Sequence, residues 1–263
     1  MSIVGILGLK LALAPSLVAT ATRVAARLGH RAGGLVGGLP VVAAPILLIY
    51  ALERGEAFAI EASRATVLGI VSLVAFCASY VLAAERGGVG GALAAGWGAF
   101  GLGTLLFEVA PIPLGGAAPL ATLTVIGAAW WLARREPAPA HSRGNDLMAW
   151  RLLATAAMVT TLTTASGALS AWLSGLLAPF PIITAVLAGF THAQSGPDAA
   201  RDLLAGLVPG LASFVVFFVA LALLIGPAGV TGAFVLASVA ALLSHALLVH
   251  RQTRVRSCLE ATA

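Results

Sequence analysis

The chain has 263 residues, of which 60% are hydrophobic and only 10% are charged. A soluble globular domain carries roughly 25% charged residues, so this composition excludes a compact soluble monomer and favours an all-α bundle embedded in the lipid bilayer. The net charge of +5 is not gathered into a basic face with aromatic side chains, so we expect no nucleic-acid partner.

Apolar segments separated by charged or proline-rich corners predict about nine transmembrane helices, each of about 20 residues. Glu108 and two prolines separate the fourth helix from the fifth, and a polar linker over residues 136–146 precedes the sixth. A basic tail follows the ninth helix. In chain order the expected helices cover residues 11–29, 34–52, 62–84, 89–107, 116–133, 152–170, 175–193, 203–225 and 229–248, with a start nearer Ile3 as the alternative for the first.

The second half of the chain repeats the first at one constant spacing. Residues 11–107 align without a gap on residues 152–248, and the matched pairs include proline, serine and phenylalanine as well as common small residues. This pattern predicts a tandem repeat of four helices. The expected units are residues 1–107, a connecting helix with a polar cytoplasmic linker over 108–147, and residues 148–263. Matched pairs are Pro40/Pro181, Ser72/Ser213, Phe76/Phe217 and Gly88/Gly229.

The odd fifth helix between the repeats predicts that they insert in opposite orientations. With the N-terminus outside, twelve of the fifteen Lys and Arg residues fall in cytoplasmic segments, and only Lys10, Arg54 and Arg64 fall outside. This distribution agrees with the positive-inside rule and predicts a cytoplasmic C-terminus. Inverted repeats are typical of secondary transporters, because two similar halves packed in opposite senses can exchange conformations.

The stretch from Gly34 to Pro40, GLVGGLP, carries a family resemblance, together with Lys10, the LERG corner at Leu52 to Gly55, and Ile60-Glu61. The second repeat has GLLAPFP from Gly175 to Pro181 and keeps Gly196, but Gln194-Ser195 replaces the charged corner. These motifs resemble the GlpM family of small four-helix bacterial membrane proteins. The resemblance implies a fused pair of four-helix units in the bacterial cytoplasmic (inner) membrane, an association with envelope polysaccharide (alginate) production, and possible partners in envelope biosynthesis.

Prolines and charges at equivalent places are the candidate substrate pathway. Pro40 and Pro181 lie early in the second helix of each repeat, where a missing backbone donor frees carbonyl groups for a ligand or for neighbouring helices. Lys10 and Arg151 begin the first helix of each repeat, either as cationic anchors for an anionic substrate or as side chains that reach the interface.

Glu61 and Asp202 are an equivalent acidic pair at the start of the third helix of each repeat. They are candidates for coupling a proton or cation, although the helix dipole alone also favours an acid there. Thr161 and Thr164 make the middle of the sixth helix polar, either for packing or for lining a pathway.

Arg23, Arg27 and Arg31 recur every fourth residue, so we expect them on one helical face against anionic lipid headgroups. His192, His245 and His250 have no metal-ligand spacing, and neither a catalytic nucleophile nor a cofactor motif is present in the sequence. We therefore expect no metal, no cofactor and no enzyme. The expected function is transport of a small solute or flippase-like movement of a lipid; the alternative is a non-transporting scaffold for envelope or exopolysaccharide production.

Overall fold

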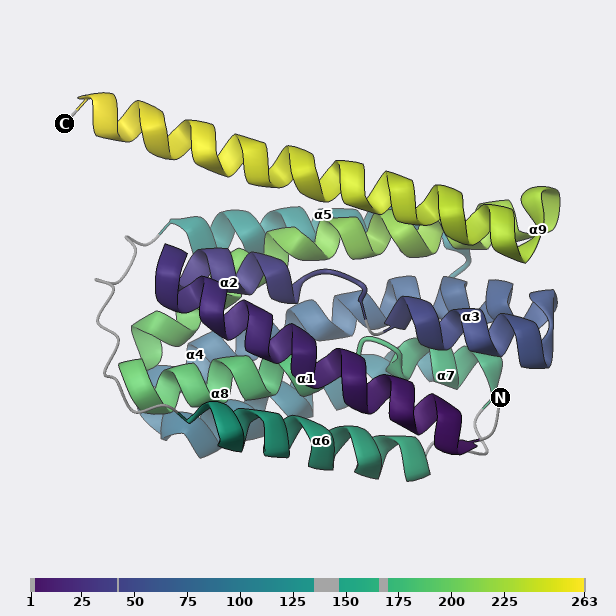
Figure 1. Cartoon of the computed structure of the whole chain (residues 1–263), viewed down its shortest axis with the longest axis horizontal. Helices are drawn as coiled ribbons and strands as arrows, with labels where there is room; N and C mark the ends of the chain where they lie inside the picture. Colours follow the sequence, from purple (N-terminus) through teal and green to yellow (C-terminus); the bar gives the residue numbers. More distant parts are fainter. Residues whose placement is uncertain (1–2, 42, 135–146, 166–169, 263) are drawn as a thin grey trace.

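The computed structural model describes residues 3–41, 43–134, 147–165 and 170–262, and every regular element in these ranges is an α-helix. This confirms the predicted all-α class. The helices lie side by side along the long axis of the molecule (Figure 1). In chain order they are α1 (Ile3–Leu28), α2 (His30–Gly37), α3 (Ala43–Arg54), α4 (Glu56–Val109), α5 (Leu114–Ala133), α6 (Met148–Ala165), α7 (Ala171–Leu177), α8 (Ile182–Ser195) and α9 (Pro197–Thr262).

The two longest helices, α4 and α9, each contain a sharp turn at a glycine. Gly88 interrupts α4 with a φ of 57°, and Gly229 interrupts α9 with a φ of 67°. Positive φ strongly favours glycine, which has no Cβ to clash. The two limbs of α4 pack together, since Gly96 lies against the ring of Phe76. Figure 1 shows the second limb of α9 returning along the outer side of the molecule toward the C-terminus. The turns fall at the predicted helix boundaries.

The second and seventh predicted helices are each divided into two helices, at the prolines that were expected to disturb them. Pro40 lies in the turn between α2 and α3, and Pro181 immediately precedes α8 after the end of α7. Proline has no N–H to donate and its ring clashes with the preceding helical turn, which explains an end to the helix at these positions. Both prolines are buried.

The short helices α2 and α7 each cross a long helix at backbone contact. Gly34 of α2 lies against the backbone of Leu203 in α9, and Gly175 of α7 lies against the backbone of Ala62 in α4. A Cβ at either glycine would fall on the carbonyl oxygen of the residue it faces. Such close approach of helices requires residues without side chains. Gly34 and Gly175 are equivalent in the sequence alignment, and so are Ala62 and Leu203.

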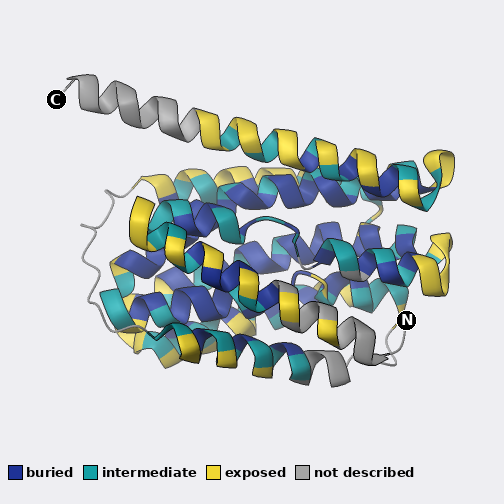
Figure 2. Cartoon of the chain, in the orientation of Figure 1, coloured by how far each residue is buried: buried dark blue, intermediate teal, exposed yellow. Residues whose placement is uncertain are grey.

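The first helices of the two halves run in opposite directions. α1 packs against α6. In Figure 1, α1 starts beside the N-terminus at the right and ends at the left, whereas α6 starts at the left and ends at the right. Buried residues gather where the inner helices meet, while the described part of the outer limb of α9 is largely exposed or half-buried (Figure 2).

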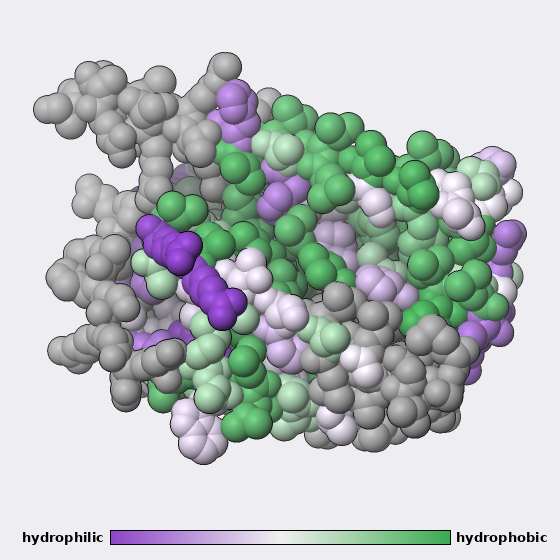
Figure 3. Space-filling model, viewed as in Figure 1, coloured by the Kyte–Doolittle hydropathy of each residue, from purple (hydrophilic) through white to green (hydrophobic). Residues whose placement is uncertain are grey.

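Large apolar side chains cover the outside of the molecule. Leu102 of α4, Ile126 of α5 and Leu242 of α9 are 60%, 59% and 61% exposed, and Figure 3 shows extensive hydrophobic surface on one face. Within the part of the chain that the structure describes, four helical stretches are long and apolar enough to cross a membrane: α4, α5, Ala171–Ser195 and Pro197–His250. An apolar exterior of this kind indicates a membrane protein.

Several helix ends differ from those predicted. α1 begins at Ile3, the earlier of its two predicted starts, whereas α6 spans Met148–Ala165 instead of 152–170, with residues 166–169 outside the described ranges. α9 continues to Thr262, so the tail predicted after Leu248 is helical. Arginine and glutamine are good helix formers, so a helix can continue through a charged segment beyond the apolar region. Hydropathy marks the end of the apolar segment and not the end of the helix.

Candidate functional site

A buried ion pair lies where α2 and α9 begin. The Arg31 guanidinium donates to Oδ1 of Asp202 through Nε at 3.3 Å and through Nη2 at 3.2 Å. Nη2 of Arg201 is 3.7 Å from the same oxygen. The side chain of Asp202 is only 3% exposed, against 31% for Arg31. The Asp202 carboxylate, almost wholly shielded from water, therefore lies between two guanidinium groups.

Glycine makes this ion pair possible. Gly206 lies one turn after Asp202 on α9, and a Cβ there would fall on the carbonyl oxygen of Arg31. Without that Cβ, the first turn of α2 approaches α9 closely enough for Arg31 to reach Asp202. Arg201 is held in addition by Asp198, whose Oδ1 accepts from Nη1 at 2.7 Å. The sequence of α9 thus supplies both acids and the space for α2.

Arg151 of α6 is the second buried cation at this end, with 5% of the residue exposed. Its Nη1 donates to Oγ1 of Thr22 in α1 at 3.1 Å, and its Nη2 donates to Oε1 of Gln194 in α8 at 2.6 Å. Its guanidinium carbon lies 5.7 Å from the centre of the Phe190 ring. Arg151 therefore joins three helices. The alternative interpretation, in which its side chain reaches the membrane interface, does not describe this arrangement.

Two histidines add polar groups near these charges. Nδ1 of His30, the first residue of α2, is buried and has no hydrogen-bond partner among the described residues. Burial lowers the pKa of His30 below its ordinary value; nearby Asp202 opposes this shift and Arg151 adds to it. His192 of α8 shares a hydrogen bond of 3.1 Å between its Nδ1 and the hydroxyl of the fully buried Tyr80 in α4. We call Arg31, Arg151, Gln194, Arg201 and Asp202, with His30, the polar cluster.

The equivalent positions at the opposite end of the molecule are arranged differently. Glu61, the counterpart of Asp202, has a side chain 44% exposed and lies 4.0 Å from Arg64. Trp172, the counterpart of Arg31, donates from Nε1 to the carbonyl oxygen of Phe107 at 3.2 Å. The predicted acidic pair is therefore one buried ion-paired residue and one residue half in solvent. The side chain of Lys10, the counterpart of Arg151, lies outside the described residues.

The remaining predicted site residues are not brought together with the polar cluster. Pro40 and Pro181 lie at the two helix breaks. The side chains of Thr161 and Thr164 lie outside the described residues, while Thr160 donates to the carbonyl oxygen of Ala156 at 2.9 Å. That bond within α6 is the packing arrangement that hydroxyls in apolar helices commonly adopt.

The arginine face expected over Arg23, Arg27 and Arg31 is not continuous. α1 ends at Leu28, and Gly29 takes a φ of 92°, so Arg31 belongs to α2 and turns inward to Asp202. Arg23 and Arg27 are exposed on α1. A spacing of four residues predicts a shared helical face only within one continuous helix, so the prediction holds for Arg23 and Arg27 and is wrong for Arg31. Gly29, directly after Leu28, marks the end of that helix.

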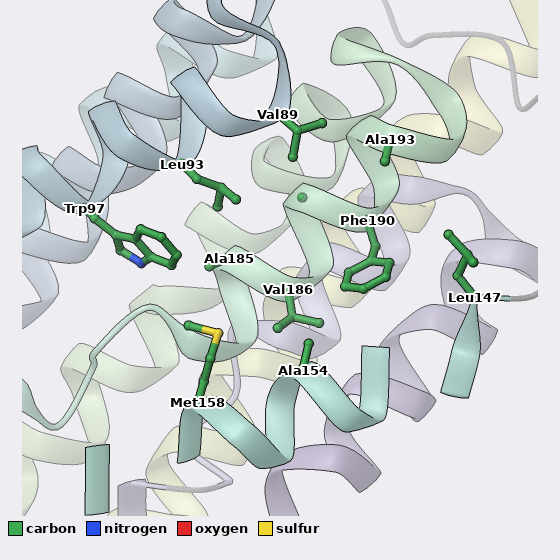
Figure 4. Close-up of a pocket in the computed structure, with 11 residues that line it drawn as sticks. Val89, Leu93, Trp97, Leu147, Ala154, Met158, Ala185, Val186, Phe190 and Ala193 are labelled. Atoms are coloured by element: carbon green, nitrogen blue, oxygen red, sulfur yellow. The ribbon is translucent and has the colours of Figure 1, made fainter. Parts of the chain in front are cut away.

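An apolar groove opens between α4, α6 and α8 (Figure 4). Its volume is about 290 Å³. Val89 and Trp97 of α4 form one wall, Met158 of α6 another, and Val186 and Phe190 of α8 form the floor between them. Sequence reasoning missed this groove, because its walls come from helices distant in the chain.

No group of three or more His, Cys, Asp or Glu side chains that could hold a metal ion occurs within the described ranges. The polar cluster can hold helices together, bind an anion or accept a proton at His30, and its contacts with α1, α2, α6, α8 and α9 place it at a junction of both halves. In comparisons with known proteins, the chain matches no family model, no curated protein and no solved structure.

Proposed function

We propose that this protein is a transporter of a small solute, or a flippase-like protein, of the bacterial cytoplasmic membrane. It would be built from two inverted four-helix repeats joined by α5, with nine membrane crossings, the N-terminus outside and the C-terminus in the cytoplasm. The observation that carries the proposal is the reciprocal packing of the interrupted helices: Gly34 of α2 against Leu203, and Gly175 of α7 against Ala62. Each half supplies a broken helix to the long helix of the other.

Backbone geometry supports the repeat. Gly55 and Gly196 are equivalent positions and have φ values of 89° and 88°. Gly88 and Gly229 are also equivalent and have φ values of 57° and 67°. Four of the five glycines with positive φ in the described chain thus form two pairs at the repeat spacing. The opposite directions of α1 and α6 support an inverted relation between the halves.

Nine crossings follow if the turns at Gly88 and Gly229 each separate two spans, and if α2 with α3, and α7 with α8, each cross once as a broken helix. Broken helices at equivalent places near the centre of a transporter expose backbone groups to a substrate. The prolines at these breaks are therefore the proposed centre of the pathway.

The polar cluster supports a closed state at one end. Arg31 and Asp202 tie α2 to α9, and Arg151 ties α6 to α1 and α8, at the end assigned to the cytoplasm by the positive-inside rule. At the other end, Glu61 is half exposed, and Trp172 occupies the position equivalent to Arg31. We therefore propose that the ion pair is a cytoplasmic gate, which separates when the site opens inward.

Cysteine labelling tests the inverted topology. Gly87 and Ala228 are equivalent, exposed residues beside the two turns. With Cys77 and Cys258 replaced by Ala, we expect a membrane-impermeant maleimide to label Ala228→Cys in intact spheroplasts and Gly87→Cys only after permeabilisation. Labelling of both residues from the same side would mean parallel repeats and would remove the main support for alternating access.

Proteoliposome assays test transport. We expect the protein to move a fluorescently tagged phosphatidylglycerol between leaflets, or to admit a radiolabelled small anion, and the Pro40→Ala/Pro181→Ala variant to fall to the rate of empty liposomes, because continuous helices remove the exposed backbone groups. Pro209→Ala, within the long helix α9, serves as the matched control and should retain the rate. An unaltered rate in the double variant would contradict the proposed pathway.

The second candidate is a non-transporting scaffold for envelope or exopolysaccharide production, with membrane-bound biosynthetic partners. It is favoured by the resemblance of the GLVGGLP and LERG motifs to the GlpM family, and the exposed apolar faces of α5 and α9 offer contact surfaces within the membrane. Wild-type protein without flux that co-purifies with a glycosyltransferase would select this candidate.

A further inference from the structure

We propose that the apolar groove between α4, α6 and α8 binds one acyl chain of an anionic membrane phospholipid, with the headgroup at the end of the groove near Arg86. This binding does not depend on transport, since a scaffold with the same groove would bind the same lipid. It requires only that the protein lies in a membrane.

The shape of the groove suits a chain that enters from one end of the bundle. Val89, Ala193 and Leu147 lie at the end where α4 turns, α8 finishes and α6 begins, whereas Trp97 and Met158 lie deeper along the helices (Figure 4). The volume of about 290 Å³ is close to the lower limit of small-molecule pockets, which is roughly 300 Å³. A flexible apolar tail can follow an open groove of this size between helices better than a rigid solute can.

The lining of the groove is apolar along its whole length. Trp97, Met158, Val186 and Phe190 present ring, thioether and branched aliphatic surfaces to the same space. Among these lining side chains the indole N–H of Trp97 is the one hydrogen-bond donor, and the thioether of Met158 is only a weak acceptor. The ligand that such a surface recognises is a hydrocarbon, because the lining offers close dispersion contacts and almost no hydrogen-bond partners.

Charge at the entrance selects the headgroup. Arg86 is exposed one turn before Val89, and Arg151 occupies the stripe of α6 between the lining residues Leu147 and Ala154. Glu85 is the acidic neighbour of Arg86 in the chain. Arg151 is engaged with Thr22 and Gln194, so it contributes a fixed positive potential, while Arg86 is placed to approach a phosphate. Two cations against one acid favour an anionic over a zwitterionic headgroup.

Native mass spectrometry of the purified, delipidated protein tests the inference with two probes of identical acyl chains, dioleoyl phosphatidylglycerol and dioleoyl phosphatidylcholine. We expect phosphatidylglycerol to bind about fivefold more tightly, the ratio that one basic side chain at a membrane surface supplies. Arg86→Gln should remove this preference, and Arg64→Gln, at another exposed arginine of α4 that does not line the groove, should preserve it. Equal binding of the two lipids to the wild type would overturn the headgroup assignment.

The groove itself is tested by filling it. A Cβ at Gly189 would meet Leu93 and Val89 at ordinary contact distances of 3.7 and 3.8 Å, so a larger side chain can enter the groove without displacing the backbone. We expect Gly189→Leu to weaken phosphatidylglycerol binding about tenfold by excluding hydrocarbon. Gly127→Leu, on the exposed face of α5 with open space around it, is the matched control.

Ala154→Leu, from the α6 wall, provides an independent variant if Gly189→Leu does not fold. In addition, phosphatidylglycerol with brominated acyl chains should quench a component of tryptophan fluorescence that is lost in Trp97→Phe. The inference is wrong if the groove variants bind like Gly127→Leu, or if Trp97→Phe leaves the quenching unchanged. Neither result would alter the outcome of the flux assay, so failure of this inference and failure of the transport proposal can be told apart.

Discussion

Replacement of Asp202 by Asn should lower the free energy of unfolding by about 2–3 kcal/mol, which is the order expected when one partner of a buried ion pair is removed. The side chain of Asp202 is 3% exposed, and it is the carboxylate between Arg31 and Arg201. Asn keeps the shape of the side chain but removes the carboxylate that both Arg31 and Arg201 face, while Arg201 still contacts Asp198. Arg31 is 31% exposed, so partial solvation keeps the loss below the largest values known for buried pairs.

The matched control is Glu61→Gln, the same change of charge at the equivalent position in the first half. Glu61 is 44% exposed and its contact with Arg64 is 4.0 Å long, so its removal should cost about 0.5 kcal/mol or less. Unfolding of both variants can be followed by circular dichroism during titration of mixed micelles with sodium dodecyl sulfate. Equal effects at the two positions would show that burial of the ion pair does not govern its contribution.

The same pair of variants bears on the proposed gate. If separation of Arg31 from Asp202 accompanies opening toward the cytoplasm, Asp202→Asn should raise the reactivity of a cysteine placed at Thr22, which lies beside Arg151 at this end. Glu61→Gln should not change it. Increased reactivity would follow from a shift toward the open state, since the ion pair is present only in the closed one.

The all-helical class and the places where the helices change direction could be predicted from the sequence. Gly88 and Gly229 mark predicted boundaries, and each has a backbone conformation that only glycine adopts readily. Pro40 and Pro181 were expected to disturb their helices, and the structure has a break at each. These features could be predicted because glycine and proline act through local backbone sterics, which do not depend on tertiary contacts.

The polar cluster could not be predicted to the same extent. Asp202 and Arg151 were candidates because of their equivalent positions in the repeat, but their partners lie far away in the chain. Arg31 was assigned to a lipid-facing stripe with Arg27, because a spacing of four residues indicates one face only within an uninterrupted helix. The turn at Gly29 rotates Arg31 away from that face and toward α9. The difference in burial between Asp202 and Glu61 could not be predicted either. Arg31 pairs with Asp202, whereas Trp172 occupies the equivalent position in the other half.

The second large effect is expected at the glycines where helices touch. Gly34→Ala and Gly175→Ala should each lower the free energy of unfolding by about 3 kcal/mol, because the added Cβ would fall on the carbonyl oxygen of Leu203 or of Ala62 and the helices must move apart. At Gly175 the shift also disturbs the hydrogen bond of 3.0 Å that Thr66 donates to its carbonyl oxygen. Unfolding in mixed micelles provides the measurement.

Gly98→Ala in α4 and Gly226→Ala in α9 are the matched controls, since a Cβ at either position has open space around it. These changes should leave stability unchanged or raise it by up to about 1 kcal/mol, because Ala has the higher helix propensity. Similar losses at Gly34 and Gly175 would mean that the two crossings contribute equally, as reciprocal contacts between two copies of one unit should. The double variant should then show the sum of the two losses, since the crossings involve different pairs of helices. A large loss at only one of the two glycines would contradict the reciprocal packing, and with it the physical basis for two halves that exchange conformations.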